Sequence, residues 1–214
     1  KKKKIIIATG GTGGHVFPAL SLSESLEEEF DIVIFSDNRG LKYFKNQKNV
    51  KEISSGTIFQ KNIFKALLSL IKIIFTITKS LFYLKKVKPE IVFGMGGYSS
   101  FPVCVASYLL KIPIIIYENN LVLGKANKAL LPIAKKIFVS SNNTTGIHKK
   151  YLNKIFVCGY LLRKEIFQIK INNLKTNNDE LSILIVGGSQ SAKVFGDKIT
   201  EIIVECKKAN VNFK

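Results

Sequence analysis

The chain has 214 residues, which is enough for one large domain or two small ones. Its hydrophobic fraction of 46% and charged fraction of 22% exclude a disordered chain and are typical of a globular protein. Lys and Arg total 33 against 15 acidic residues, and the net charge of +18 favours an anionic partner: a phosphorylated substrate, an anionic membrane or nucleic acid. Composition does not choose among these, because solvated surface lysines give the same excess.

Two interpretations can be set aside early: a framework of cysteines and a signal peptide. Cys104, Cys158 and Cys206 lie far apart with no C-x-x-C pair, which favours a reducing cytosol over a disulfide framework or a zinc site. The basic start of the chain resembles a signal peptide, but its apolar run at 5–7 is too short and soon reaches glycine.

Short apolar runs that end in glycine or polar residues recur along the chain. The runs are continuous rather than alternating, which is typical of strands buried on both faces. Patterns typical of helices separate several of them, at 19–30, 100–110 and 125–134. This alternation predicts a parallel, doubly wound α/β fold, in which ligands bind outside the carboxyl ends of the strands. The predicted strands are 5–8, 32–35, 91–93, 112–117, 137–140, 156–158 and 183–186.

The first predicted strand runs into the glycine-rich segment 9–15, Thr-Gly-Gly-Thr-Gly-Gly-His. Backbone N–H groups at the start of a following helix can face a phosphate, although a tight strand-to-helix turn would use the same residues. Neither the P-loop nor the dinucleotide-binding spacing is present. His15, at the exit of this loop, could act as an acid or base or could only pack.

Two more glycine-rich loops follow predicted strands, at 94–100 and at 187–191. Three such loops at strand ends together predict a cleft that handles diphosphate groups. Asn120 and Arg163 also follow strands; the first could bond a sugar and the second a phosphate, or they could be a turn residue and a surface residue.

The apolar stretch 63–84 is interrupted by lysines seven residues apart, at Lys65, Lys72 and Lys79. No charge-free run exceeds six residues there, so the pattern favours an amphipathic helix over a spanning one. Such a helix could lie in a membrane interface, with Phe75 and Phe82 on its apolar face, or it could be a core helix with snorkelling lysines.

The loops, in this order, resemble the peptidoglycan glycosyltransferases commonly called the MurG family, glycosyltransferase family 28. The resemblance covers most of the chain and is carried by five blocks. These are residues 10–19 (GGTGGHVFPA), 94–98 (GMGGY), Glu118-x-Asn120 with Gly124 and Asn127-Lys128, Gly159-x-x-x-Arg163, and 187–190 (GGSQ).

The resemblance implies a GT-B fold: a Rossmann-like, acceptor-binding N-terminal domain, here residues 1–160, and the start of a UDP-sugar-binding domain, here 161–214. It implies inverting transfer of N-acetylglucosamine from UDP-N-acetylglucosamine to undecaprenyl-linked lipid I, forming lipid II without a bound metal. It also implies that the protein binds peripherally to the anionic surface of the plasma membrane, on its cytoplasmic face. By resemblance, the donor contacts are Thr12, Gly13, Gly14, Asn120, Arg163 and Ser189; the acceptor-side loop is Gly96, Gly97 and Tyr98; and His15 is the candidate base.

The chain departs from the family pattern at three places. Tyr117 stands where the family usually has His, Tyr160-Leu161 stands where it usually has Asn-Pro, and Ser191 stands where it usually has Gly. The chain also ends before most of the second domain, so the isolated fragment is expected to be inactive. One alternative is a non-catalytic, membrane-recruiting subunit of a split glycosyltransferase. A nucleic-acid-binding module is disfavoured, because the basic residues are spread out and no recognition motif is present.

Overall fold

A computed structural model describes residues 2–44, 47, 49–53, 63–168, 184 and 192–209. The chain divides into two compact units, Lys1–Phe167 and Gln168–Lys214. In the second unit the structure describes helix α7 (Ala192–Lys208). The loop at 187–191 with Ser189, and all of the strand at 183–186 except Leu184, lie outside the described residues. The functional boundary expected after residue 160 stays a prediction.

The first unit contains a seven-stranded parallel sheet in the order β3-β2-β1-β4-β5-β6-β7. Six of these seven strands were predicted from the sequence, and the parallel α/β fold is confirmed. The seventh, β3, has only three residues, of which two are charged, so its pattern does not stand out in the sequence. The strands are β1 (Lys3–Ala8), β2 (Phe30–Ser36), β3 (Val50–Glu52), β4 (Ile91–Gly94), β5 (Ile114–Glu118), β6 (Lys136–Val139) and β7 (Ile155–Val157).

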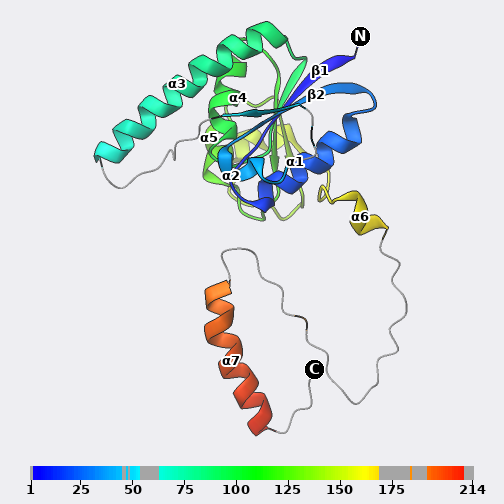
Figure 1. Ribbon diagram of the computed structural model, residues 1–214, viewed down its shortest axis with the longest axis vertical. Coiled ribbons are helices and arrows are strands. Elements are labelled where there is room, and N and C mark those ends of the chain that lie inside the picture. The colour runs from blue at the N-terminus through cyan, green and yellow to red at the C-terminus, as the bar shows by residue number, and fades with distance from the viewer. Residues whose placement is uncertain are drawn as a thin grey trace. The chain divides into compact units, whose positions relative to one another are not determined.

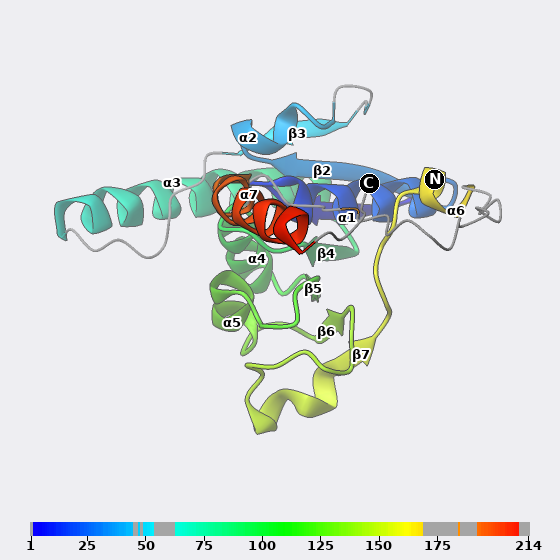
Figure 2. The same ribbon diagram turned by 90° about the horizontal axis from the view of Figure 1, so that it is seen from below.

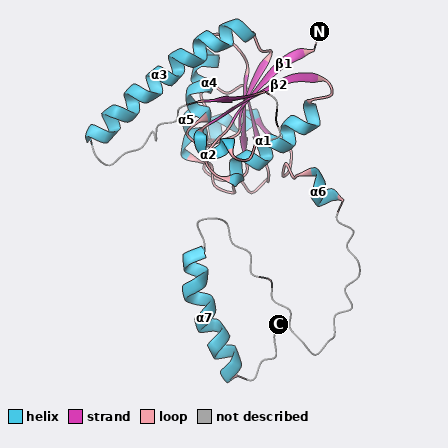
Figure 3. Ribbon diagram, in the orientation of Figure 1, coloured by secondary structure: helices cyan, strands magenta, loops and turns pink. Residues whose placement is uncertain are grey.

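Helices flank this sheet (Figures 1 and 3). The helix predicted at 19–30 instead begins at Gly13, inside the glycine loop, and ends at Leu26. A run of three glutamates at 27–29 follows it, and negative charge is unfavourable at a helix C-terminus. The helix predicted at 125–134 ends at Leu130, because Pro132 has no N–H group to continue the helical hydrogen bonds. The helices are α1 (Gly13–Leu26), α2 (Asn38–Leu41), α3 (Ile63–Val87), α4 (Ser100–Leu109), α5 (Lys125–Leu130) and α6 (Lys164–Phe167), with a 3₁₀ helix at Lys149–Lys154.

Both faces of the sheet are buried, as the continuous apolar runs predicted. Alternate residues of β1 divide between two clusters: Ile6 packs with the cluster that holds Leu84 of α3 and Val103 of α4, and Ile7 packs with the cluster that holds Val16 of α1. Figure 2 shows α4 and α5 together on one side of the strands. Burial of whole strands on two sides makes the sheet a rigid support for the loops at its edges.

The strand order reverses between β1 and β4. From β1 the chain first builds outward through β2 and β3, and it then returns so that β4 pairs with the other edge of β1, with Ile5 beside both Ile32 and Ile91. In open α/β sheets this switch point leaves a crevice at the carboxyl ends of the strands. The first two glycine-rich loops follow β1 and β4, so they meet at this point.

Candidate functional site

The two glycine-rich loops approach too closely for any side chain larger than hydrogen. Gly96 and Gly97 have φ angles of +85° and +75°, which L-residues with side chains rarely adopt. A Cβ atom at Gly96 would lie 2.6 Å from Nδ1 of His15, and one at Gly97 would lie 2.9 Å from the carbonyl oxygen of Gly10. The glycines of the second loop therefore let it pack directly on the first.

His15 lies in the first turn of α1 and is half-buried. Its Nδ1 atom is 3.1 Å from the carbonyl oxygen of Met95. Burial lowers the pKa of His15 from its ordinary value, and the opposing effects of Glu118 and of the Met95 carbonyl are smaller. The ring is therefore neutral at pH 7. Because a carbonyl only accepts, Nδ1 carries the proton, and Nε2 keeps a lone pair that can take one.

Asp37, directly after β2, ties the first loop to the second. Its carboxylate is 3% exposed and accepts hydrogen bonds from Gly11 N at 2.9 Å, Gly40 N at 3.0 Å and Ser99 Oγ at 3.0 Å. Arg39 donates to it at 2.9 Å. Burial raises the pKa of Asp37, but these hydrogen bonds together outweigh burial and lower it. Asp37 is thus a charged support beneath the loop.

Glu118, at the end of β5, supports the loop 119–124 in the way that Asp37 supports the first glycine loop. It is 1% exposed, and its Oε1 accepts from the backbone N and the Nδ2 of Asn120 at 2.9 and 2.8 Å. Its Oε2 accepts from Gly124 N at 2.8 Å and from Asn127 Nδ2 at 3.0 Å. Glu118 therefore fixes both the loop 119–124 and the start of α5.

A cavity of about 180 Å³ lies where these segments meet. It brings together His15, the predicted acceptor-side loop of Gly96, Gly97 and Tyr98, and the predicted donor contact Asn120. The starts of α1 and α5 lie at its edge, and helix starts attract negative charge. Lys125 adds a cationic side chain. The remaining lining residues are Glu118, Gly124, Ala126 and Asn127.

Four other predicted donor contacts, Thr12, Gly13, Gly14 and Arg163, lie elsewhere in the first unit. Thr12 is the N-cap of α1 and makes no side-chain capping hydrogen bond, and Gly13 and Gly14 form the first turn. Arg163 lies over the ring of Phe17 on α1, with 4.7 Å between Cζ and the ring centroid. None of these four lines the cavity.

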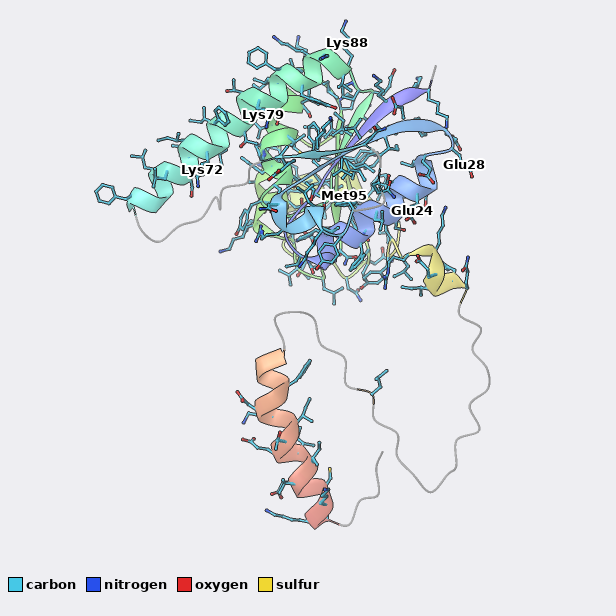
Figure 4. All side chains as sticks on the ribbon, in the orientation of Figure 1. Glu24, Glu28, Lys72, Lys79, Lys88 and Met95 are labelled. Carbon is cyan, nitrogen blue, oxygen red and sulfur yellow. The ribbon has the colours of Figure 1, made fainter. Side chains whose placement is uncertain are left out.

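The predicted membrane residues lie on α3, which projects beyond the rest of the unit at its N-terminal end (Figures 1 and 2). Lys72 and Lys79 follow one another along it (Figure 4). Phe75 and Phe82 are 67% and 72% exposed. The side chain of Lys65 lies outside the described residues.

By length and composition alone, the stretch Leu67–Val87 of α3 could cross a membrane, although the sequence analysis set that interpretation aside. Its inner face nevertheless belongs to the fold. Ile73 and Leu84 are buried, and α3 packs along α4.

Sequence reasoning missed the supports of the site. Asp37, Ser99 and Lys125 were not predicted as site residues, and Glu118 and Asn127 were noted only as parts of a motif. Their positions directly after strands or at helix starts are the signal that could have found them. Among the described residues, no group of three or more His, Cys, Asp or Glu side chains could hold a metal ion.

Comparison with known proteins decides the family. Residues 5–139 match the glycosyltransferase family 28 N-terminal domain. The chain belongs to glycosyltransferase family 28. The matched segment contains the first two glycine-rich loops, His15, Asp37 and the Glu118–Asn127 network, so all residues that line the cavity lie within the family 28 domain.

The curated relatives carry one enzyme name, UDP-N-acetylglucosamine--N-acetylmuramyl-(pentapeptide) pyrophosphoryl-undecaprenol N-acetylglucosamine transferase. The protein from Pelagibacter ubique is 40% identical over 207 residues, covering 96% of this chain and 57% of that protein. The one from Francisella tularensis subsp. tularensis (strain SCHU S4 / Schu 4) is 34% identical, covering 100% and 60%. This family 28 chain thus spans less than two thirds of the length of these relatives.

Solved structures agree on the fold. Acinetobacter baumannii MurG superposes with a TM-score of 0.67 at 27% identity, covering 92% of this chain and 53% of that one. A complex of S. aureus MnaA with UDP gives a TM-score of 0.58 at 19% identity, covering 84% and 51%, which supports the fold alone.

Proposed function

We propose that this chain is the acceptor-side part of an inverting glycosyltransferase that moves N-acetylglucosamine from UDP-N-acetylglucosamine to lipid I, forming lipid II. The observation that carries the proposal is the cavity at the β1/β4 switch point of a family 28 domain. The neutral His15, the amide of Asn120 and the starts of α1 and α5 converge there. The names of the relatives supply the substrates. Because the chain spans about 60% of those relatives, we expect the isolated 214 residues to be inactive.

The geometry of His15 fits the role of general base. Met95 holds the Nδ1–H, so the Nε2 lone pair accepts the proton of the acceptor hydroxyl. The hydroxyl oxygen forms a bond to the anomeric carbon of the donor from the side opposite UDP. The bond from that carbon to the diphosphate oxygen breaks, its electron pair leaves with UDP, and the configuration inverts.

In this proposal, backbone N–H groups rather than a metal ion stabilise the negative charge of the diphosphates. The first turn of α1 offers N–H groups at Gly13 and Gly14, and Thr12 leaves them uncapped by its side chain. Arg163 would add a cation for a donor phosphate, and the predicted contact Ser189 lies outside the described residues. Asn120, held by Glu118, would bond a sugar hydroxyl or amide.

A transfer assay tests this function. The protein translated from the complete reading frame is mixed with UDP-N-acetylglucosamine labelled in the sugar and with a lipid I analogue, and labelled lipid is counted. We expect His15→Gln to lower the rate roughly 10²–10⁴-fold, the range for loss of a general base. His148→Gln, at the exposed second histidine, is the matched control. Unchanged turnover in His15→Gln would assign the base elsewhere.

The same assay separates the alternative of a split enzyme. If the complete protein binds the lipid I analogue but transfers no sugar, the chain is an acceptor-side subunit that needs a separate donor subunit. If it neither binds the analogue nor transfers sugar, the proposed substrate is wrong.

We further propose that α3 docks this protein on the cytoplasmic face of the plasma membrane. The support is an apolar surface that the first unit leaves uncovered, with lysines beside it. Insertion of such a face combines apolar burial with attraction to anionic lipid. Its most exposed apolar side chains are Phe64, Leu67, Leu68, Leu70, Ile71, Ile74, Phe75 and Phe82.

Liposome sedimentation tests the membrane proposal. We expect binding to vesicles that contain anionic lipid and weaker binding to neutral ones. Phe75→Ser should reduce that binding, whereas Phe167→Ser, at an equally exposed phenylalanine on α6, should not. Equal and negligible binding of the unsubstituted protein to both vesicle types would end this proposal.

A further inference from the structure

Tyr117 places a hydroxyl where the sheet meets the segment that leads out of the first unit. Its side chain is 2% exposed and lies on β5, directly before Glu118. The hydroxyl is 3.2 Å from the carbonyl oxygen of Gly159 and accepts a hydrogen bond from Leu161 N at 3.3 Å. It is also 3.1 Å from Oδ1 of Asn119, and because a hydroxyl has one proton it donates to one of these two oxygens at a time.

Residues 159–164, the connecting segment, are held at a second place by α1. Ser21 Oγ donates to the carbonyl oxygen of Leu162 at 2.6 Å, and Lys164 Nζ donates to that of Glu24 at 3.3 Å. Between these contacts, the Arg163 guanidinium lies over Phe17, two residues after His15. The connecting segment is thus laid along successive turns of α1, and Tyr117 holds its beginning.

We propose that Tyr117 is a positioning residue whose hydroxyl fixes the connecting segment, and with it Arg163, beside the first glycine loop. Gly159 has a φ angle of +81° with open space around its α-carbon, so the chain can turn freely there and needs an external contact to set its direction. Tyr117 supplies that contact. Burial raises its pKa to about 12, so the hydroxyl keeps its proton throughout the physiological range.

Two departures from the family pattern meet in this contact. A proline at position 161 would have no N–H to donate, so the Leu161 donor and the Tyr117 acceptor belong together. That Arg163 meets a donor phosphate rests on the proposed function. The position of Arg163 does not, and it is tested without any substrate.

Amide hydrogen exchange on the 214-residue chain, followed by NMR, tests the proposal. Tyr117→Phe removes one oxygen and keeps the buried ring, and Tyr108→Phe, at an exposed tyrosine on α4, is the control. We expect exchange at Leu161 to accelerate roughly tenfold in Tyr117→Phe, the factor for losing about one hydrogen bond. The nuclear Overhauser contact between Arg163 and the Phe17 ring should weaken, and Tyr108→Phe should change neither.

Three results would overturn the proposal. Unchanged exchange at Leu161 would mean that the hydroxyl holds nothing. Uniform acceleration through the first unit would mean that Tyr117 only stabilises the fold. Local acceleration with an undiminished Arg163–Phe17 contact would mean that α1 alone positions the arginine. Failure of the transfer assay leaves all three readouts unaffected, so the two proposals fail separately.

Discussion

The cavity edge and the outer face of α3 are built in opposite ways. Glu118, which lines the cavity, and Asp37, which supports the first glycine loop, are 1% and 3% exposed, and each carboxylate accepts several hydrogen bonds from the loops around it. On α3, Phe64 and Phe75 are 77% and 67% exposed. Buried charges with partners give a rigid arrangement that can hold a reacting group. A contiguous apolar face in water is costly to keep and marks a surface that binds something apolar.

At the cavity, the largest effect that this comparison predicts is at Glu118. In Glu118→Gln one oxygen becomes an NH₂ group that faces N–H donors, so at least one of Asn120 and Gly124 loses its acceptor. We expect the free energy of unfolding to fall by about 3 kcal/mol, as for a buried, charge-assisted network with unpaired donors. Urea denaturation measures this. Glu28→Gln, fully on the surface, should change it by less than about 0.5 kcal/mol; similar losses for both would refute the contrast.

The next effect separates backbone strain from close packing in the second glycine loop. Gly96→Ala should cost about 2 kcal/mol, because the φ of +85° disfavours a side chain and the new Cβ meets His15. Gly159→Ala has nearly the same φ with nothing nearby, so it should cost only about 1 kcal/mol. Thermal or urea unfolding of the pair gives the difference. Equal costs would show that His15 does not crowd Gly96.

A smaller effect is expected from the titration of His15. Its pKa is lowered in the folded protein, so between that value and the unfolded value of 6.5 the unfolded chain binds more protons. The stability contribution is therefore fully present above pH 6.5 and is lost as the pH falls below it. Comparing unfolding at pH 7.5 and 5.5, we expect His15→Gln to flatten this decline and His148→Gln to keep it. An unaltered decline in His15→Gln would assign it to other groups.

The sequence was sufficient for the parallel sheet and for five residues of one cavity, because runs of β-branched residues and glycine loops at strand ends are local signals. It was insufficient for Asp37 and Glu118 as supports. The importance of Asp37 comes from hydrogen bonds with segments far apart in the chain, such as that from Ser99, and no local pattern encodes these. Glu118 bonds only nearby residues, Asn120, Gly124 and Asn127, and the sequence showed these residues as a motif without showing that they meet at one carboxylate. Strand β3 was not predicted for a similar reason, because its conformation depends on its pairing with β2.

The smallest effect on stability is expected on the outer face of α3, and it sharpens the comparison most. Phe75→Ser removes an exposed ring and should change the free energy of unfolding by less than about 0.5 kcal/mol. Leu84→Ala, nine residues further along the same helix but fully buried in the core, should cost about 2–5 kcal/mol. Denaturant unfolding in the absence of lipid measures both. A large loss in Phe75→Ser would mean that the fold itself needs this face, and the surface would then no longer be available for a membrane.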